Sequence, residues 1–435
     1  MERVDALLEV GQGLLDEEAS EEAEAMFREA LSLAPGNPEV LFLLGWSLYD
    51  QDDYEQAESY LRQAGEIDPT APEPQQYLGI CLFEQERFDE AAEILEKAAS
   101  LDPENPSVYR WLGNAYSSLK LHAEAAQAFR GLVTHEPDDG ENHFWLGLSL
   151  YHAGQPEHAE VAFAEAVTLE PDEEGHHYWL AFVLSSQEKY EEAEAVLRSA
   201  VEEENLEDVD LLGLWADVLL KQDKLEEAYQ RVEEGLALET VDAHLFWLGG
   251  EVLSGLERED EAISMYRRAV ELSPSDSTYH WFLGQALLHA EETEEARRCF
   301  ENAVKFGPLD SENYLWLGRS LLDLELSVEA IETLNKASEL EPDNSDIVFW
   351  QGRALLEHGK LDEAVEALEQ SSVLDPEEEA HYYWLGRALY EQEKYTRAAQ
   401  AFAAAVDLNP TDEENNYWLA RCKTMEHMGV NWNVE

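Results

Sequence analysis

The sequence predicts an all-α solenoid of about twelve tandem helical hairpins, and three regular features of the chain support this fold. A proline recurs every 34 residues, a glycine recurs at the same interval, and an alanine always follows the glycine after twelve residues. The three series are Pro35, Pro69, Pro103, Pro137 and Pro171; Gly11, Gly45, Gly79, Gly113 and Gly147; and Ala23, Ala57, Ala91, Ala125 and Ala159. A fixed period of this length is typical of repeat proteins, in which stacked units share one continuous core.

The repeats are numbered here so that the glycine stands at position 8, the alanine at position 20 and the proline at position 32. Repeats then begin near residues 4, 38, 72, 106, 140 and 174, and again near 209, 243, 277, 311, 345 and 379. The repeat that begins at 209 lacks the expected glycine and proline but keeps Ala216 and Ala228 twelve residues apart. The predicted organisation is 1–207 for about six N-terminal repeats, 208–242 for a degenerate repeat, 243–412 for five C-terminal repeats, and 413–435 for a capping helix, near 413–426, and a tail.

Each repeat is expected to form two antiparallel helices. Apolar residues recur with helical spacing at positions 4, 7, 8 and 11, and again at 17, 20, 24 and 27. The small residues at positions 8 and 20 allow the two helices to approach closely, and the proline at position 32 ends the second helix. No extended alternation of β-branched residues occurs, so the predicted fold class is all-α.

The repeat pattern resembles the tetratricopeptide repeat, for example in YYWLGRALYEQEKYTRAAQAFAAAVDLNP near the C-terminus. The resemblance covers nearly the whole chain. The resemblance implies a right-handed superhelix with a concave groove lined by the first helices. It also implies an interaction role, because most members of that family are scaffolds, adaptors or co-chaperones. The Lys and Asn set by which chaperone-binding members hold a carboxylate does not occur here, and fold alone does not fix function.

Tryptophan recurs at position 6 of the predicted first helices, whereas the family usually carries its bulky aromatic residue at position 4. At about 100° per residue, position 6 points away from positions 4, 7, 8 and 11, which face the partner helix. The rings either fill the seam between adjacent first helices or remain partly exposed as anchors for a bound segment. The series is Trp111, Trp145, Trp179, Trp316, Trp350, Trp384 and Trp418, and Trp215, Trp247 and Trp281 continue it one residue out of register.

Arginine occupies position 9 in four successive C-terminal repeats, three residues after each tryptophan, as Arg319, Arg353, Arg387 and Arg421. Residues three apart share a helical face, so each pair forms one module. Since guanidinium groups hold carboxylates in a bidentate fork, this line favours an acidic or carboxylate-bearing peptide. Alternatively, the arginines pair with neighbouring glutamates or stack on the indoles. The candidate peptide-binding residues are Trp111, Trp145, Trp179, Trp316, Arg319, Trp350, Arg353, Trp384, Arg387, Trp418 and Arg421.

The N-terminal repeats carry a mainly apolar line at position 9, formed by Trp46, Ile80, Asn114, Leu148 and Phe182. Together with the neighbouring tryptophans, this line indicates a groove for an apolar or amphipathic segment. It is equally suited to self-association.

The charge of the chain restricts its partners. Ninety-six acidic residues against 28 basic ones leave a net charge of −68 and a pI near 4.2. Such a surface repels nucleic acids and anionic membranes, whereas basic partners are attracted. The same composition is also typical of salt-adapted proteins, and both interpretations stay open.

No chemistry-bearing motif stands out. Cys81, Cys299 and Cys422 are far apart, which argues against a disulfide framework, and no metal-binding, phosphate-binding or nucleophile motif occurs. We therefore expect no cofactor, no metal and no enzymatic activity. The absence of a signal peptide and of a long apolar stretch favours a cytoplasmic protein.

The leading functional hypothesis is a non-catalytic scaffold or adaptor that holds segments of partner proteins in its groove. The alternatives are a self-assembling structural solenoid, forming oligomers or filaments, and a substrate-recruiting subunit of an enzyme complex. Trp418, Cys422 and Met425 make the last helix weakly polar, which is compatible with docking at that end.

Overall fold

A computed structural model describes residues 2–206, 208–238 and 242–432 of the chain, with side chains described as far as residue 426. Over these ranges the regular structure is α-helical apart from one short π-helix, and no strand occurs. The chain divides into an N-terminal unit, Met1–Gln222, and a C-terminal unit, Asp223–Glu435. Residue 207, residues 239–241 of the predicted degenerate repeat and residues 433–435 of the predicted tail lie outside the described residues.

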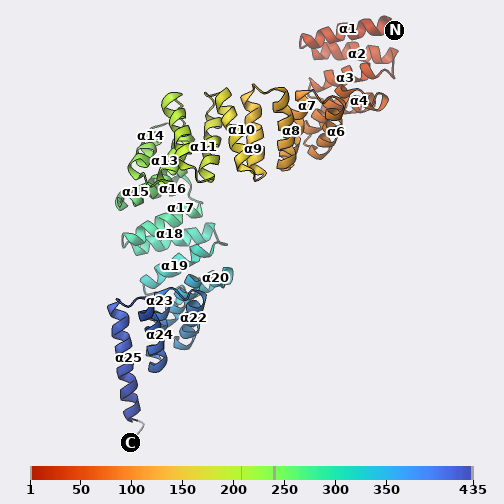
Figure 1. The fold of residues 1–435 in the computed structure, drawn as a ribbon. Helices are drawn as coiled ribbons and strands as arrows, with labels where there is room; N and C mark the ends of the chain where they lie inside the picture. The colour runs from red at the N-terminus through yellow and green to blue at the C-terminus, as the bar shows by residue number, and fades with distance from the viewer. Residues whose placement is uncertain (1, 207, 239–241, 433–435) are drawn as a thin grey trace. The chain divides into compact units, whose positions relative to one another are not determined.

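The N-terminal unit is a stack of helical hairpins, in which helices α8 to α11 lie side by side (Figure 1). Its helices are α1 (Glu2–Asp16), α2 (Ser20–Leu33), α3 (Pro38–Tyr49), α4 (Tyr54–Ile67), α5 (Pro72–Glu84), α6 (Phe88–Leu101), α7 (Pro106–Ser118), α8 (His122–His135), α9 (Gly140–His152), α10 (Pro156–Leu169), α11 (Glu174–Ser186), α12 (Tyr190–Arg198), the π-helix η1 (Ser199–Glu203) and α13 (Val209–Lys221).

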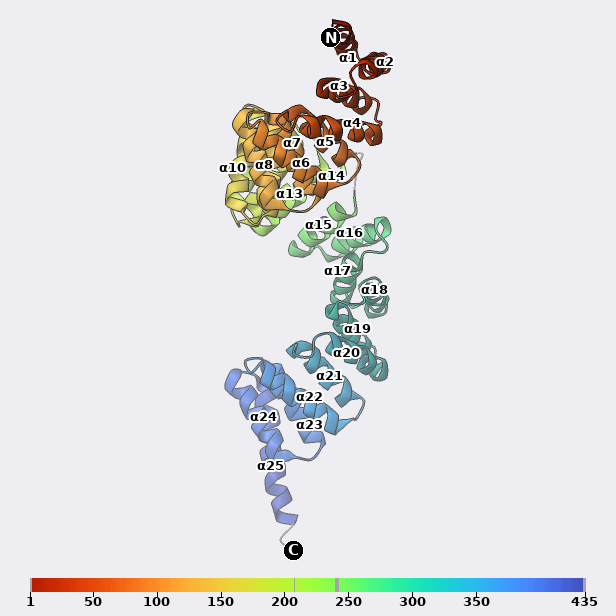
Figure 2. The ribbon, with the colours of Figure 1, turned by 90° about the vertical axis from the view of Figure 1, so that its right-hand side faces the viewer.

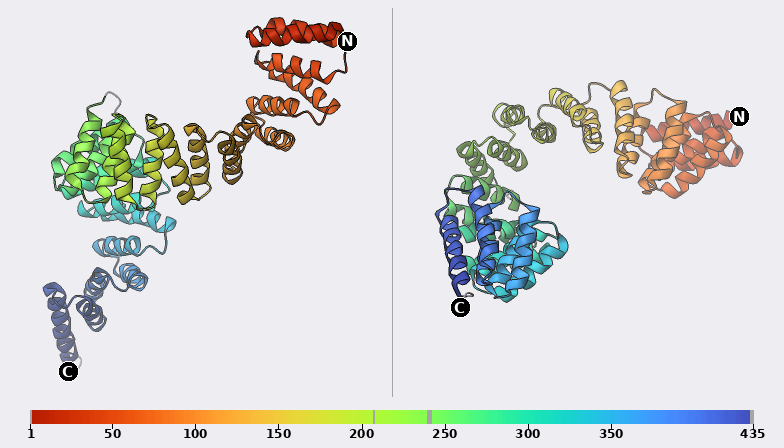
Figure 3. Two further views of the ribbon diagram at one scale, coloured as in Figure 1. Left: turned by 45° about the horizontal axis from the view of Figure 1, so that its top comes forward. Right: turned by 60° about the horizontal axis from the view of Figure 1, so that its bottom comes forward.

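The C-terminal unit continues the same alternation of first and second helices, as the succession from α16 to α20 shows (Figure 2). Its last helix packs against α24 (Figure 3). The helices are α14 (Leu225–Leu236), α15 (Ala243–Gly255), α16 (Glu259–Leu272), α17 (Ser277–His289), α18 (Thr293–Phe306), α19 (Ser311–Asp323), α20 (Ser327–Leu340), α21 (Ser345–Glu357), α22 (Leu361–Leu374), α23 (Glu379–Glu391), α24 (Tyr395–Leu408) and α25 (Glu413–Trp432).

The predicted all-α repeat solenoid is confirmed, since every repeat proposed from the sequence supplies one first helix and one second helix. The irregular stretch before the degenerate repeat begins as a π-helix, which extends α12 before the chain turns. The last helix is longer than expected and ends at Trp432 rather than near residue 426. No proline interrupts this segment, so nothing stops the helix earlier.

Helix ends follow local signals in the sequence. Most first helices begin after an aspartate or asparagine whose side chain accepts a backbone N–H of the first turn, as Asn37, Asp139 and Asp310 do. Second helices end shortly before the proline at position 32; α2, for example, ends at Leu33, two residues before Pro35. These signals set the same boundaries in repeat after repeat.

The two helices of a hairpin meet at the glycine of position 8. A Cβ atom added at Gly113 would lie 2.7 Å from the ring of Phe129, the position-24 residue of the same repeat. Gly284 and Phe300 stand in the same relation, again at 2.7 Å. The glycine is therefore required by close approach of the second helix, as the sequence pattern indicates.

A residue with positive φ, between 58° and 80°, closes the turn between the helices of each repeat at position 15. Ten of these residues are not glycine: Glu18, Asp52, Glu86, Lys120, Glu188, Asp223, Glu257, Glu291, Glu325 and Glu393. Gly154 and Gly359 occupy the other two sites. The left-handed conformation costs a non-glycine residue about 1 kcal/mol, so hairpin packing must outweigh this strain.

Within each unit, successive first helices contact one another more extensively than successive second helices do. Examples are α3 with α5 in the N-terminal unit and α19 with α21 in the C-terminal unit. The surface formed by first helices is therefore the inner side of each stack. The side chains at positions 6 and 9 belong to these helices.

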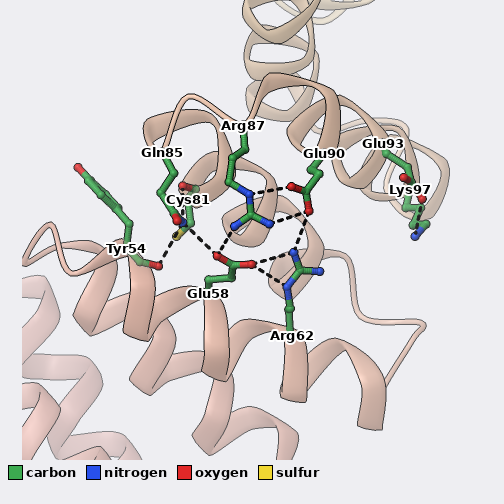
Figure 4. Close-up of polar contacts among 9 residues, drawn as sticks. All are labelled: Tyr54, Glu58, Arg62, Cys81, Gln85, Arg87, Glu90, Glu93 and Lys97. Carbon is green, nitrogen blue, oxygen red and sulfur yellow. Dashed lines mark hydrogen bonds and ion pairs between the residues drawn. The ribbon is translucent and has the colours of Figure 1, made fainter.

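Polar bridges join neighbouring repeats in the N-terminal unit. Glu58 accepts hydrogen bonds from Arg62 at 2.8 Å, Arg87 at 2.7 Å and Gln85 at 3.2 Å, and thereby connects α4 to the turn between α5 and α6 (Figure 4). The glutamine at position 14 repeats this contact with the glutamate at position 21 of the preceding repeat. The pairs are Gln51–Glu24, Gln85–Glu58, Gln187–Glu160 and Gln222–Glu194.

Candidate functional site

The tryptophans at position 6 lie at the seam between repeats, and four of them stack on the position-24 phenylalanine of the preceding second helix. Their ring centres are 6.0–6.4 Å apart and their interplanar angles are 13–25°. Such pairs contribute about 0.5–1.5 kcal/mol beyond the area they bury. The pairs are Trp145–Phe129, Trp179–Phe163, Trp316–Phe300 and Trp418–Phe402.

The position-6 rings fill the seam and also reach the surface. Trp145 is 36% exposed, and Trp111, Trp179, Trp316, Trp350, Trp384 and Trp418 are half-buried. Each of these rings thus packs partly between repeats and is partly exposed, and its role as an anchor for a bound segment stays a prediction.

The three tryptophans that are out of register differ from this series. Trp215 is only 3% exposed, and the indole N–H groups of Trp247 and Trp281 are buried without a hydrogen-bond partner in the described part of the chain. A shift of one residue turns a side chain by about 100° around its helix. These three rings are therefore less suited to contact a ligand.

Glutamates four residues earlier hold three of the surface indoles in place. The indole N–H of Trp145, Trp316 and Trp418 donates to Glu141 at 3.2 Å, to Glu312 at 3.1 Å and to Glu414 at 3.4 Å. Burial raises the pKa of Glu312, and the hydrogen bond from Trp316 partly opposes that effect. The indole nitrogen is thereby occupied, and the ring faces remain for other contacts.

The four position-9 arginines lie over the tryptophans and form a continuous Trp–Arg ladder along the first helices α19, α21, α23 and α25. Arg319 lies 3.9 Å from the ring centre of Trp316 and 4.6 Å from that of Trp350. Arg353 lies 4.4 Å from Trp350 and 4.2 Å from Trp384. In chain order the ladder is Trp316, Arg319, Trp350, Arg353, Trp384, Arg387, Trp418 and Arg421.

The ladder arginines have few carboxylate partners of their own. Arg353 forms one ion pair, with Glu357 at 3.4 Å. Arg387 donates to the Tyr383 hydroxyl at 3.0 Å. Arg421 donates to two tyrosine hydroxyls, each at 2.9 Å. Arg319 has no carboxylate within ion-pair distance among the described residues.

Burial between the indoles affects the pKa of the first two guanidinium groups of the ladder. It lowers the pKa of Arg319 and of Arg353, although nearby carboxylates, Asp323 among them, oppose the change. Both groups remain protonated at neutral pH because arginine starts from a pKa above 12. The Nε atom of Arg353 is buried without a hydrogen-bond partner in the described residues. Stacking occupies the faces of the guanidinium plane, whereas its N–H donors point outward within that plane.

The N-terminal unit has no arginine at position 9. Trp46, Asn114, Leu148 and Phe182 are half-buried there, but Ile80 is only 4% exposed and belongs to the core. The predicted apolar line is therefore interrupted at Ile80.

Aromatic rings replace guanidinium groups around the N-terminal tryptophans. Trp179 lies 5.9 Å from Tyr151 and 5.5 Å from Phe182, in addition to its stack on Phe163. An acidic recess adjoins Trp145, lined by Asp139, Glu141, Glu170 and Glu173 together with Phe144 and His176. The same repeat position thus has a different chemical environment in each unit.

Three tyrosines that accept hydrogen bonds from ladder arginines were not predicted from the sequence, namely Tyr383, Tyr390 and Tyr417. Two of them precede a ladder arginine by four residues and could have been found from that spacing. Tyr390 reaches Arg421 from the preceding repeat, so its role depends on how the repeats stack.

The described residues hold neither a cluster of metal ligands nor a membrane-spanning helix. Among the described residues, no group of three or more histidine, cysteine, aspartate or glutamate side chains is placed to hold a metal ion. No helix in the same ranges combines the length and apolar character needed to cross a bilayer.

Comparisons with known families identify the repeat. Models of the tetratricopeptide repeat match residues 14–79 and 82–145, and residues 248–310, 290–346 and 349–413. A model of anaphase-promoting complex, cyclosome, subunit 3 matches residues 121–200. No significant match occurs among curated protein sequences.

Several solved helical structures are similar to this chain over most of its length. The crystal structure of the APC/C hetero-tetramer Cut9–Hcn1 is 14% identical and has a TM-score of 0.41, covering 98% of this chain and 91% of that one. Yeast Tom70 is 18% identical with a TM-score of 0.39, covering 98% and 96%. The structure of Naa15/Naa10 bound to HypK-THB is 15% identical with a TM-score of 0.46, covering 99% and 80%. No functional conclusion follows from likeness at this level.

Proposed function

Because the chain belongs to the tetratricopeptide repeat family, we propose that it is a non-catalytic protein-interaction scaffold whose C-terminal unit binds carboxylate-bearing segments along the Trp–Arg ladder. The ladder lies on the inner side of the stack, where a bound segment can contact several repeats in succession. Each repeat then adds one guanidinium contact, and the contacts reinforce one another because they belong to the same ligand.

The lack of carboxylate partners on the ladder carries this proposal. The other arginines of the C-terminal unit form ion pairs with glutamate, and these are Arg231, Arg258, Arg267, Arg268, Arg297, Arg298 and Arg397. The chain offers 96 acidic residues for only 28 basic ones. In so acidic a protein, an arginine without a carboxylate partner is unusual. Of the four ladder arginines, only Arg353 has one among the described residues.

The chemistry of the ladder suits a carboxylate. The tryptophans hold each guanidinium plane in a fixed orientation, so less side-chain entropy is lost when a ligand binds. N–H groups in the guanidinium plane can then donate to both oxygens of a carboxylate in a bidentate geometry. Such charge-assisted hydrogen bonds are about twice as strong as neutral ones.

The proposal is tested by binding of fluorescent acidic peptides to the full-length protein and to two double variants. The ladder variant, Arg353→Gln with Arg387→Gln, removes two positive charges from the ladder. The control variant, Arg267→Gln with Arg397→Gln, removes two positive charges from second helices, so the two variants have equal net charge. We expect the ladder variant to weaken binding at least tenfold and the control variant to leave it within twofold. Equal binding by the two variants would remove the ladder from the proposal.

Light scattering over a range of protein concentrations examines the alternative of self-assembly. A monomer at every concentration excludes an oligomer or filament as the working form. An oligomer that dissociates in the ladder variant, but not in the control, would instead identify the ladder as a self-association surface.

A further inference from the structure

The spacing of the ladder arginines restricts the backbone of a bound segment. Arg319 and Arg353 lie 4.6 Å and 4.4 Å from the centre of the Trp350 ring, so their guanidinium carbons are at most about 9 Å apart. Arg353 and Arg387 lie 4.2 Å and 5.8 Å from the centre of the Trp384 ring, which limits their separation to about 10 Å.

The last two arginines have a similar upper limit on their separation, and helix packing sets a minimum spacing between successive repeats. Arg387 and Arg421 lie 4.5 Å and 5.2 Å from the ring centre of Trp418, again at most about 10 Å apart. The first helices α19, α21 and α23 contact one another in turn, and the axes of helices in contact are about 8–10 Å apart. Equivalent residues of successive repeats are therefore spaced by about 8–10 Å.

Few peptide backbones present side chains at this interval on one face. A β-strand returns to the same face every two residues, after about 6.7 Å. An α-helix returns after one turn, at about 5.4 Å, or after seven residues, at about 10.5 Å, which exceeds all three upper limits. A polyproline II helix has three residues per turn and rises about 3.1 Å per residue, so every third residue lies on one face about 9.3 Å apart.

We propose that the ladder recognises a polyproline II segment with an acidic residue at every third position, four acids over ten residues. This inference rests on the proposed function and specifies its ligand. Each acid pairs with one arginine, from Arg319 to Arg421, and the segment runs across successive first helices. Charge complementarity fixes the face of the segment that meets the protein.

The tryptophans supply a second contact that favours proline between the acids. Trp350 and Trp384 lie between successive arginines and are half-buried, so part of each ring meets the solvent. Polyproline II segments dock readily on aromatic surfaces, and their backbone is already extended before binding. A proline next to each acid therefore rests against the aromatic part of the ladder and reduces the entropy lost on binding.

The net charge of the chain gives the interaction an uncommon dependence on salt. A protein of charge −68 repels an acidic peptide at long range, whereas the ladder attracts it at contact. At 0.1 M salt the Debye length is about 10 Å, and repulsion between charges farther apart than this is largely screened. Association should therefore become faster between low and moderate salt, the opposite of binding between oppositely charged partners.

The test uses three fluorescent ten-residue peptides and the full-length protein. The first peptide has glutamate at its positions 1, 4, 7 and 10, with proline and serine between them. The second has the same composition with glutamate at 1, 3, 5 and 7, and the third replaces the glutamates of the first by glutamine. Fluorescence anisotropy gives the dissociation constants, and circular dichroism verifies that the variants keep their helicity.

We expect the first peptide to bind at least tenfold more tightly than the second and the third, and this preference to vanish in the Arg353→Gln, Arg387→Gln variant. If the two acidic peptides bind equally well and both depend on the ladder arginines, the three-residue register is wrong and the proposed function stands. If no acidic peptide distinguishes the ladder variant from the Arg267→Gln, Arg397→Gln control, both the register and the proposed function are wrong.

Discussion

The two units share one repeat frame but surround their position-6 tryptophans with different neighbours. In the N-terminal unit, glutamine and arginine bridge to glutamates between repeats, as around Glu58 (Figure 4), and the position-6 tryptophans have aromatic neighbours. In the C-terminal unit the tryptophans alternate with arginines on the inner side. The difference shows that hairpin packing fixes positions such as 8 and 20, whereas positions 6, 9, 14 and 21 vary with the task of each segment.

The largest effect that separates the units is expected from removing a tryptophan. Trp179→Ala should cost about 3 kcal/mol of unfolding free energy, because the ring loses several aromatic neighbours and leaves a cavity. Trp384→Ala should cost less, about 2 kcal/mol, since two of its contacts are guanidinium groups that water can solvate again. Urea unfolding followed by circular dichroism measures both losses.

The same two variants also differ in their effect on a ligand. Trp384→Ala should weaken acidic-peptide binding, whereas Trp179→Ala should leave it unchanged. Val161→Ala, at a side chain 63% exposed, serves as a control for stability. Equal stability losses and equal peptide binding would mean that tryptophan plays one and the same role in both units.

Two glutamates are expected to respond to pH with opposite signs. Burial raises the pKa of Glu58, but hydrogen bonds from Arg62, Gln85 and Arg87 outweigh it, so the pKa is lowered overall. Burial raises the pKa of Glu251 in α15, and the hydrogen bond from Tyr266 only partly opposes this. Ionised Glu58 thus stabilises the fold above the ordinary glutamate range, whereas Glu251 destabilises it as the pH rises through its raised pKa.

At neutral pH, Glu58→Gln should lower the unfolding free energy by about 1–2 kcal/mol, and Glu251→Gln should raise it by up to about 1 kcal/mol. Both differences should shrink as the pH falls toward 4 and below, where the carboxylates become protonated. Thermal unfolding between pH 4 and 8 measures them. Glu93→Gln, which breaks only an exposed pair with Lys97 in the same region as Glu58, should change nothing at any pH. A shift of the same sign for Glu58 and Glu251 would contradict the assigned environments.

The repeat frame was accessible from the sequence because its signals recur. The series of proline, glycine and alanine predicted every hairpin, and helix geometry correctly turned position 6 away from its own partner helix. The sandwiching of Arg319 and Arg353 between tryptophans of two repeats was not accessible, since it depends on how closely the first helices stack.

Other features gave no local signal. The left-handed residue of the turn is usually a glutamate or another non-glycine residue, so it resembles the rest of an acidic surface, although Gly154 and Gly359 mark the equivalent position in two repeats. The bridge from Gln85 to Glu58 joins residues 27 positions apart, and neither residue type is distinctive alone. Such contacts become visible only when the hairpins are placed side by side.

Introducing arginine at position 9 of the N-terminal unit should transfer the binding property. Asn114→Arg with Leu148→Arg places guanidinium groups beside Trp111, Trp145 and Trp179, in the pattern of the C-terminal unit. In a protein whose own ladder is disabled by Arg353→Gln and Arg387→Gln, we expect this change to restore acidic-peptide affinity about tenfold, or about 1.4 kcal/mol. Fluorescence anisotropy measures it. Asn114→Gln with Leu148→Gln is the control, and equal affinity in both would show that the C-terminal site needs more than its Trp–Arg pattern.

The smallest effect is expected from Arg353→Lys. This substitution separates the contribution of the positive charge at position 9 from that of the planar guanidinium group. Lysine keeps the charge but cannot stack a planar group between Trp350 and Trp384, so part of two cation–π contacts is lost, about 0.5 kcal/mol of stability. Peptide affinity should fall severalfold, because an ammonium group does not hold a carboxylate in a bidentate fork. Arg397→Lys, on a second helix and paired with Glu369, should change neither quantity measurably. If lysine at position 353 binds the peptide as well as arginine does, charge alone governs the ladder, and the tryptophans stabilise the repeats without orienting the guanidinium groups.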